Sequence, residues 1–156
     1  MKKMIIALAI LVSMVGAVNA QVQETTLGIR FANAFNGGEL TLQLPLGAKN
    51  RLELDLGLTN WRGSDDGFQL TGVYQWVFGL NEIATGLNVY AGLGGSLGTY
   101  NYSNDNSDLG LGFVGQLGIE YNFNIPLQIS LDWRPTIFNT YYTYYGGNGI
   151  SLRYRF

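Results

Sequence analysis

The two side chains best placed for acid–base chemistry in this chain are Glu53 and Asp55. They lie in a segment where polar and apolar residues alternate, so on an extended strand both carboxylates face the same side, about 6.6 Å apart. A carboxylate pair at this spacing could supply the acid and the base of a hydrolase. The alternative is an interior ion-pair network with Arg30, Arg51 or the arginines of the last two segments. We favour the network, because a buried charge requires a partner.

A second cluster of charged residues lies near the end of the chain. Asp132 and Arg134 alternate with apolar residues in one segment, and Arg153 and Arg155 do so in the next one. If the two segments are neighbouring strands, their side chains lie close together on one face. We interpret the four residues as a structural lock across the closing seam of a barrel.

The polar faces of the alternating segments carry charges of both signs in equal number. We predict that these residues form one interior ion-pair network: Arg30, Glu39, Arg51, Glu53, Asp55, Glu120, Asp132, Arg134, Arg153 and Arg155. Within it, we expect Arg153 and Arg155 to find acidic partners in Asp132 and in Glu39 or Glu120. Balanced charge is what a closed interior needs, because an unpaired buried charge is costly.

The stretch Gly110-Leu111-Gly112-Phe113-Val114-Gly115 matches the spacing of a dinucleotide-binding loop, G-x-G-x-x-G. That motif requires a preceding strand and a following helix. Here the alternation of small and apolar residues continues through the match, which indicates the interior of a strand. We therefore predict no nucleotide cofactor and interpret the glycines as small inward residues in a narrow lumen.

The composition argues against several classes of function. The 156 residues include no histidine and no cysteine, so the commonest general base, the commonest metal ligand and all thiolate chemistry are absent. We predict no catalytic residue, no metal site and no cofactor, and nothing specific supports an enzyme that uses carboxylates alone. The chain has no basic stripe, so nucleic-acid binding is not expected.

Period-two alternation predicts the elements that must position these side chains. Helices are excluded, because a 3.6-residue period would distribute leucines and charges around every side. Eight strands are expected, over 27–32, 39–46, 51–59, 68–76, 86–98, 109–121, 127–134 and 149–156. The predicted fold class is all-β: an eight-stranded antiparallel up-and-down transmembrane β-barrel that forms a single domain over residues 21–156.

Alternation alone would also fit a soluble barrel with an apolar cavity. A soluble barrel would carry many lysines on its outer surface, whereas residues 21–156 contain one lysine, Lys49, in a turn. An arginine that faces lipid at mid-depth costs about 2–4 kcal/mol. We therefore expect the leucine faces to point outward into lipid and the charged faces to point into the lumen, with aromatic residues near the strand ends as girdles.

The first twenty residues have the pattern of a cleavable signal peptide. Lys2 and Lys3 precede an apolar run over 4–15, and small residues follow it up to Ala20. The apolar run is shorter than the roughly 20 residues that a membrane-spanning helix needs. We expect export with cleavage after Ala20 and a final location in the outer membrane.

Several segments resemble those of a known family. The stretches 67–74, 86–94, 117–123 and 129–135, with the terminal Tyr154-Arg155-Phe156, are similar to the small outer-membrane barrels of the OmpA/OmpX kind. They are closer still to the largely uncharacterised outer-membrane barrel proteins of Bacteroidetes. The resemblance implies insertion by the outer-membrane assembly machinery, with Tyr154 and Phe156 as its signal. Ser151 departs from the pattern, since the family usually has glycine there. The family brings no catalytic residues.

Short turns are expected on the periplasmic side and longer loops outside. The turns are placed at 47–50, 79–85 and 123–126, and the loops near 35–38, 60–67, 99–108 and 138–147. Two outer loops are rich in Tyr, Asn, Ser and Gly, a composition typical of adaptable binding surfaces. Surface contacts are predicted for six tyrosines: Tyr100, Tyr102, Tyr141, Tyr142, Tyr144 and Tyr145. An equally open interpretation is that these tyrosines only mark the lipopolysaccharide boundary.

The predicted function is a non-enzymatic integral outer-membrane barrel with a structural or surface-contact role through its extracellular loops. Its expected partners are outer-membrane lipid and lipopolysaccharide, the assembly machinery and an unidentified extracellular ligand. The alternative is a small channel or ligand-carrying barrel, although eight strands leave a lumen that side chains can fill. The chain is expected to be a monomer.

Overall fold

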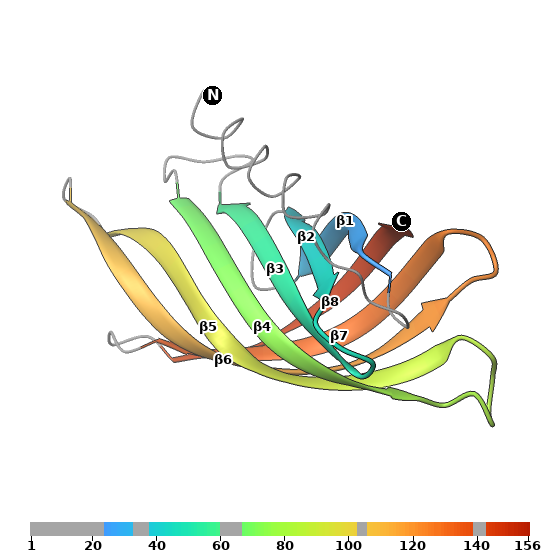
Figure 1. The fold of residues 1–156 in the computed structure, drawn as a ribbon. Helices are drawn as coiled ribbons and strands as arrows, with labels where there is room; N and C mark the ends of the chain where they lie inside the picture. Colours follow the sequence, from blue (N-terminus) through green and yellow to red (C-terminus); the bar gives the residue numbers. More distant parts are fainter. Residues whose placement is uncertain (1–23, 33–37, 60–66, 103–105, 139–142) are drawn as a thin grey trace.

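The computed structural model describes residues 24–32, 38–59, 67–102, 106–138 and 143–156, and these residues form eight strands. In chain order the strands are β1 (Thr26–Ala32), β2 (Gly38–Pro45), β3 (Asn50–Thr59), β4 (Gly67–Gly79), β5 (Leu87–Tyr102), β6 (Asn106–Asn122), β7 (Leu127–Phe138) and β8 (Thr143–Arg155). Figure 1 shows long, tilted strands that curve around a common axis. In the described part of the chain, no helix is long and apolar enough to cross a membrane.

Each strand pairs antiparallel with its neighbours in the chain, and β1 pairs with β8 to close the barrel. The closing seam runs from Thr26 opposite Arg155 to Ala32 opposite Gly149. The predicted all-β, eight-stranded antiparallel barrel is thereby confirmed. The predicted signal peptide, residues 1–20, lies outside the described residues.

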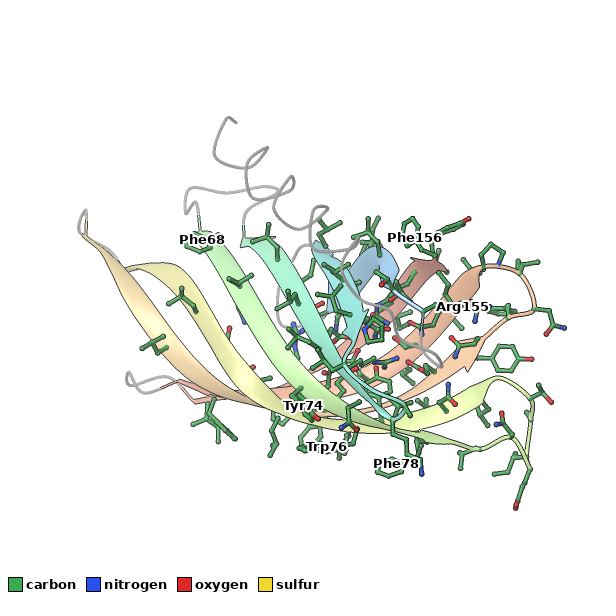
Figure 2. All side chains as sticks on the ribbon, viewed as in Figure 1. Phe68, Tyr74, Trp76, Phe78, Arg155 and Phe156 are labelled. Atoms are coloured by element: carbon green, nitrogen blue, oxygen red, sulfur yellow. The ribbon has the colours of Figure 1, made fainter. Side chains whose placement is uncertain are left out.

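Side-chain alternation divides each strand into an inward and an outward face. In β3, Arg51, Glu53 and Asp55 are buried in the lumen, while the leucines between them face outward. Figure 2 shows Trp76 and Phe78 pointing away from the barrel on the outer side of β4. The charged residues of β3 thus lie on the inner face, as the alternation predicted.

The outer face is apolar around most of the barrel. Large apolar side chains that are 48–64% exposed occur on six strands, and they include Ile29, Phe78, Leu93, Leu111, Phe113, Leu117, Leu131, Trp133, Ile150 and Leu152. Leu42 and Leu44 of β2 hold outward positions by their register and are exceptions, being buried. A protein in water rarely leaves so much apolar surface uncovered.

The three described connections, residues 46–49, 80–86 and 123–126, lie at one end of the barrel, which we call the turn end. Gly86, which precedes β5, has a φ of 90°, a conformation that glycine adopts without strain. A Cβ atom at this position would lie 2.3 Å from the backbone oxygen of Asn122. This turn therefore requires glycine.

The strands at the opposite end are longer than the sequence predicted. Residues 99–108 were expected to form a loop, but β5 continues to Tyr102 and β6 begins at Asn106, with Tyr100 opposite Asp108. β8 likewise begins at Thr143, inside the loop expected over 138–147. The polar side chains of these residues predict strand ends, but the backbone ladder does not depend on side-chain polarity. The expected loops at 35–38 and 60–67 lie almost wholly outside the described residues.

Pro135 interrupts the ladder of β7, because proline has no backbone N–H. The register with β8 shifts at this point: Arg134 pairs with Gly147, whereas Thr136 pairs with Tyr144. Proline is tolerated at such an irregularity of the ladder, where a backbone donor is not needed. Arg134 and Thr136 are both buried, so the inward face of β7 continues past the irregularity.

Candidate functional site in the barrel interior

The barrel lumen brings nine charged side chains together from six strands. Four are arginines and five are carboxylates, and each is at most 5% exposed: Arg30, Arg51, Arg134, Arg153, Glu39, Glu53, Asp55, Glu120 and Asp132. Figure 2 shows side-chain nitrogen and oxygen atoms concentrated between the strands of the barrel. These residues are the main chemical feature of the molecule, and they form three clusters.

The first cluster, which we call the Arg134 cluster, lies farthest from the turn end. Arg30 binds Glu39 at 2.9 Å and binds both carboxylate oxygens of Asp132, at 2.5 and 3.1 Å. Arg134 binds both carboxylate oxygens of Glu39, at 2.5 and 2.6 Å, and Oδ2 of Asp55 at 2.5 Å. Two guanidinium groups therefore join three carboxylates into one network.

The second cluster centres on Glu53. Its Oε2 accepts hydrogen bonds from Arg153 at 2.9 Å and from Gln43 at 2.7 Å, and its Oε1 accepts one from Gln116 at 2.8 Å. Arg153 also donates to the hydroxyl of Ser130 at 2.8 Å. With both oxygens engaged and the side chain fully buried, Glu53 has no position free for a substrate. The acid–base interpretation of Glu53 and Asp55 has no support in this geometry.

The third cluster lies nearer the turn end, where Arg51 and Glu120 form a two-point ion pair at 2.6 and 3.0 Å. The Nε of Arg51 donates to Gln75 at 2.5 Å. Its guanidinium carbon lies 4.9 Å from the centroid of the Tyr90 ring, within the range of a cation–π contact. The Tyr90 ring in turn packs on Gly118, where an added Cβ would lie 2.3 Å from the ring.

Glu53 and Asp55 pair with arginines of the last two strands, Arg153 and Arg134, which agrees with the network expected for these two carboxylates. The partners expected for Arg153 itself, and for Asp132, were wrong. Arg153 binds Glu53 of β3, across the lumen, and not Asp132, Glu39 or Glu120. Asp132 binds Arg30 of β1, across β8. A long arginine side chain in a narrow barrel reaches beyond the neighbouring strand, and alternation along a single strand cannot reveal this reach.

Arg155 is also misplaced by the sequence-based prediction. Its side chain is 20% exposed and pairs with Glu24 at 3.2 Å. It also donates to the backbone oxygens of Phe123 and Ile125, at 2.7 and 3.1 Å. Arg155 therefore stabilises the turn end and does not belong to the interior network.

Four buried oxygen atoms have no hydrogen-bond partner within the described structure: Oδ1 of Asp55, Oε1 of Gln69 and the hydroxyl oxygens of Tyr90 and Ser151. The amide nitrogen of Gln69 donates to Thr71 at 3.1 Å and to Ser96 at 2.6 Å. Sequence reasoning did not single out Gln69, Thr71 or Ser96. Their alternation put them on the inward face, but only the register between strands places them beside Asp55.

The remaining motifs carry no site in the described residues. The G-x-G-x-x-G stretch lies inside β6, paired with β5, so it lacks the following helix that nucleotide binding requires. Among the described side chains, no group of three or more His, Cys, Asp or Glu residues could hold a metal ion. The interior charges mainly bind one another and hold the strands together.

The residues predicted to act at the surface are only partly described. Tyr154 and Phe156 face outward, and their ring centroids lie 5.1 Å apart in an edge-on arrangement. Their role as an assembly signal stays a prediction. The backbone of the strands includes four of the six predicted contact tyrosines: Tyr100, Tyr102, Tyr144 and Tyr145. The side chains of these four residues, and Tyr141 and Tyr142 entirely, lie outside the described part of the chain.

Solved structures that are similar to this barrel include the following two. The N-terminal β-barrel domain of Pseudomonas aeruginosa OprF matches with a TM-score of 0.66 and 14% sequence identity, over 87% of this chain and 100% of that one. The Yersinia pestis outer membrane protein Ail, in a phospholipid bilayer nanodisc, matches with a TM-score of 0.54 and 15% identity, over 86% of this chain and 99% of that one.

No protein-family model matches the sequence, and no curated protein matches it. At 14–15% identity, the two structural matches establish the eight-stranded barrel fold alone. This fold agrees with the broader resemblance to small OmpA-like barrels. The narrower resemblance to Bacteroidetes barrel proteins stays a prediction.

Proposed function

We propose that this chain is a non-enzymatic integral outer-membrane β-barrel with a structural or surface-contact role. The observation that carries the proposal is the distribution of side chains: nine charges are buried in the lumen, while large apolar side chains cover most of the outside. A soluble protein has the opposite distribution, with charged side chains on the outside and apolar side chains in the interior. Lipid around the barrel would cover the outer surface, and closure of the sheet pairs the backbone groups that lipid cannot satisfy.

Aromatic side chains near the turn end support a membrane boundary at that level. Three edge-on pairs occur close to strand ends: Tyr74–Trp76, Tyr121–Phe123 and Tyr154–Phe156. Tyr74 also accepts a hydrogen bond from Asn50 at 2.6 Å, so its ring has one apolar side and one polar end. Amphipathic rings of this kind favour the interface between lipid and water.

The contents of the lumen favour a closed barrel over the alternative of a channel. Each of the four interior arginines is bound to at least one carboxylate, and Gln75 and Gln116 donate further hydrogen bonds between the clusters. An eight-stranded barrel has an interior just wide enough for side chains to fill. We therefore place the biological contacts on the end opposite the turns, where the predicted tyrosine-rich segments lie.

The proposal includes a location and partners. The chain is exported by its amino-terminal segment, inserted by the outer-membrane assembly machinery and surrounded by phospholipid and lipopolysaccharide as a monomer. The similarity to Ail, whose structure is described as that of an outer membrane protein, supports this location.

A gel-shift and fractionation experiment tests the membrane placement. We expect the protein to fractionate with outer membranes and to migrate faster on SDS gels before boiling than after it, because a closed barrel resists detergent. The control is the same sample heated before loading. Recovery in the soluble periplasmic fraction, with one mobility under both conditions, would contradict the proposal.

Conductance measurements separate the closed barrel from the alternative of a small channel. Purified barrel reconstituted into planar lipid bilayers should give no steady single-channel current at moderate voltage. The matched variant Arg51→Ala removes the guanidinium that joins Glu120, Gln75 and Tyr90, so it should open a leak if the network is what blocks the lumen. A steady current from the unaltered protein would favour the channel.

A further inference from the structure

A row of inward polar side chains crosses β3, β4 and β5 beside the Arg134 cluster. Asp55 lies opposite Thr71, and Thr71 lies opposite Ser96. Gln69 shares the inward face of β4 with Thr71, and its amide N–H groups donate hydrogen bonds to the hydroxyl oxygens of Thr71 and Ser96. In this orientation the amide oxygen of Gln69 is left without a donor. The row is therefore rich in oxygen atoms and short of hydrogen-bond donors.

The two unsatisfied oxygens of this row belong to deeply buried side chains. Asp55 is 1% exposed and Gln69 is 3% exposed. One carboxylate oxygen of Asp55 binds Arg134, and the other, Oδ1, has no partner in the described structure. Buried acceptors are nearly always satisfied in folded proteins, so two unsatisfied ones on adjacent strands call for an explanation.

The balance of buried charge in the lumen also points to Asp55. The buried charges of the described lumen are four arginines and five carboxylates, which gives 4 − 5 = −1. Glu39, Glu53, Glu120 and Asp132 each have hydrogen bonds to both oxygens. Asp55 is the one of these five carboxylates with an oxygen that no donor binds, so an excess negative charge would be compensated least there.

We propose that this row binds one monovalent cation of the size of Na⁺, which we call the Asp55 site. Oδ1 of Asp55 and Oε1 of Gln69 are its principal ligands, and the hydroxyl oxygens of Thr71 and Ser96 are further ligands. Carboxylate and carbonyl oxygens suit hard cations, and one positive charge neutralises the lumen. The described residues hold no group of three acidic or metal-binding side chains there, which disfavours a divalent ion.

Access to the Asp55 site would come from the end opposite the turns. Beyond Asp55 and Ser96, the next inward positions toward that end are Gly57 on β3 and Gly98 on β5, and Gly110 of β6 lies opposite Gly98. These glycines contribute no side chain there, so the side chains that border this part of the row are those of Glu39, beside Gly57, and of Gln69, opposite Gly57 and Gly98. The Asp55 site goes beyond the proposed structural role, because a barrel closed to ion flow can still bind a cation.

Thermal unfolding of the barrel in detergent micelles tests the Asp55 site. The unfolding temperature would be measured in NaCl and in choline chloride at equal ionic strength, since choline is too large to enter the site. A bound ion stabilises the folded state in proportion to ln(1 + [Na⁺]/Kd), so Na⁺ at ten times Kd should raise Tm by about 3–5 °C. Equal Tm values in the two salts would overturn the proposal.

Three variants test whether the difference in Tm between Na⁺ and choline arises at the Asp55 site. Asp55→Asn removes the excess charge and Gln69→Leu removes the amide oxygen, so both should lose the difference between Na⁺ and choline. Gln75→Leu is the matched control: Gln75 lies on the same face of β4, but both ends of its amide are already satisfied. Its Tm should fall in both salts while the Na⁺ response stays.

A Na⁺ response that persists in Asp55→Asn or Gln69→Leu would place the ion elsewhere and overturn the Asp55 site. If Asp55→Asn fails to fold, the Gln69→Leu variant alone tests the Asp55 site. Gln69 belongs to no ion pair, so its replacement leaves the interior ion pairs intact. Anomalous diffraction from crystals grown with Tl⁺ gives a direct readout, with a peak expected beside Asp55. A stability that depends on pH but not on Na⁺ would show that a proton compensates the charge, and would also overturn the proposal.

Discussion

The side chain of Arg30 on β1 crosses over Gly149 on β8 and binds Asp132 on β7. Two contacts make the ion pair, Nη2 to Oδ1 at 2.5 Å and Nε to Oδ2 at 3.1 Å. Gly149 lies directly opposite Asp132, and a Cβ atom there would lie 2.4 Å from Nη2 of Arg30. One ion pair thus ties three strands together at the closing seam, and a glycine leaves the room for it.

Gly149→Ala should weaken the barrel at this crossing. The added methyl group must displace a guanidinium that Asp132 and Glu39 hold in place, and forced repacking of this kind costs about 1–3 kcal/mol. The free energy of unfolding in urea, measured on barrels folded in lipid vesicles, would show the loss. Gly47→Ala is the control, since an added Cβ meets nothing within 4 Å there. Equal stability of the two variants would contradict the position of the Arg30 side chain over Gly149.

Asp132→Ala should be more damaging than the loss of an exposed acid. It leaves Arg30 buried with one partner fewer, and breaking a buried ion pair costs about 3–5 kcal/mol. Glu24→Ala is the matched control, because Glu24 is 55% exposed where it pairs with Arg155, and exposed pairs contribute about 0–1 kcal/mol. Unfolding midpoints of both variants under the same conditions give the comparison. Similar midpoints would count against a stabilising interior network.

The ring of Tyr90, and not its hydroxyl, should stabilise the lumen. The hydroxyl is buried without a hydrogen-bond partner in the described structure, so Tyr90→Phe should change the free energy of unfolding by less than about 1 kcal/mol or raise it slightly. Tyr90→Ala removes the ring that packs on Gly118 and Arg51, and should cost about 3–5 kcal/mol. Chemical unfolding of the two variants side by side is the test. A large loss for Tyr90→Phe would mean that the hydroxyl has a partner.

The sequence was sufficient to predict the fold because the information lies in single strands. The leucines of β2 and β3 alternate with charged and polar residues, and this period of two defines an inner and an outer face without knowledge of any neighbour. The scarcity of lysine then indicated which face points outward. Both inferences depend on local pattern and composition, and both hold in the structure.

The sequence narrowed the partners of Glu53 and Asp55 to a group of arginines, but it could not single out which arginine each carboxylate binds. Arg153 and Glu53 are 100 residues apart and face each other across the lumen, so their contact depends on the tilt and register of strands that are not neighbours. The extent of β5 was missed for a different reason. Residues such as Asn101 mark a change of side-chain polarity, while the backbone pairing with Ser107 continues. Register and strand length are determined by the pairing of strands in the closed sheet, and not by the sequence of one strand.

A charge placed on the outer face tests whether that face contacts lipid. Leu117 lies in the middle of β6, is 54% exposed and is flanked by Ala91 and Trp133 on the neighbouring strands. Leu117→Arg should destabilise the barrel in phospholipid vesicles by about 2–4 kcal/mol, since an arginine at mid-depth must be removed from water. Ile83→Arg is the control: Ile83 is 74% exposed in the turn before β5, where the cost should be about 0–1 kcal/mol. Leu117→Ala separates the loss of the leucine from the gain of charge. If Leu117→Arg were no more destabilising than Leu117→Ala, the apolar face would be covered by something other than a bilayer.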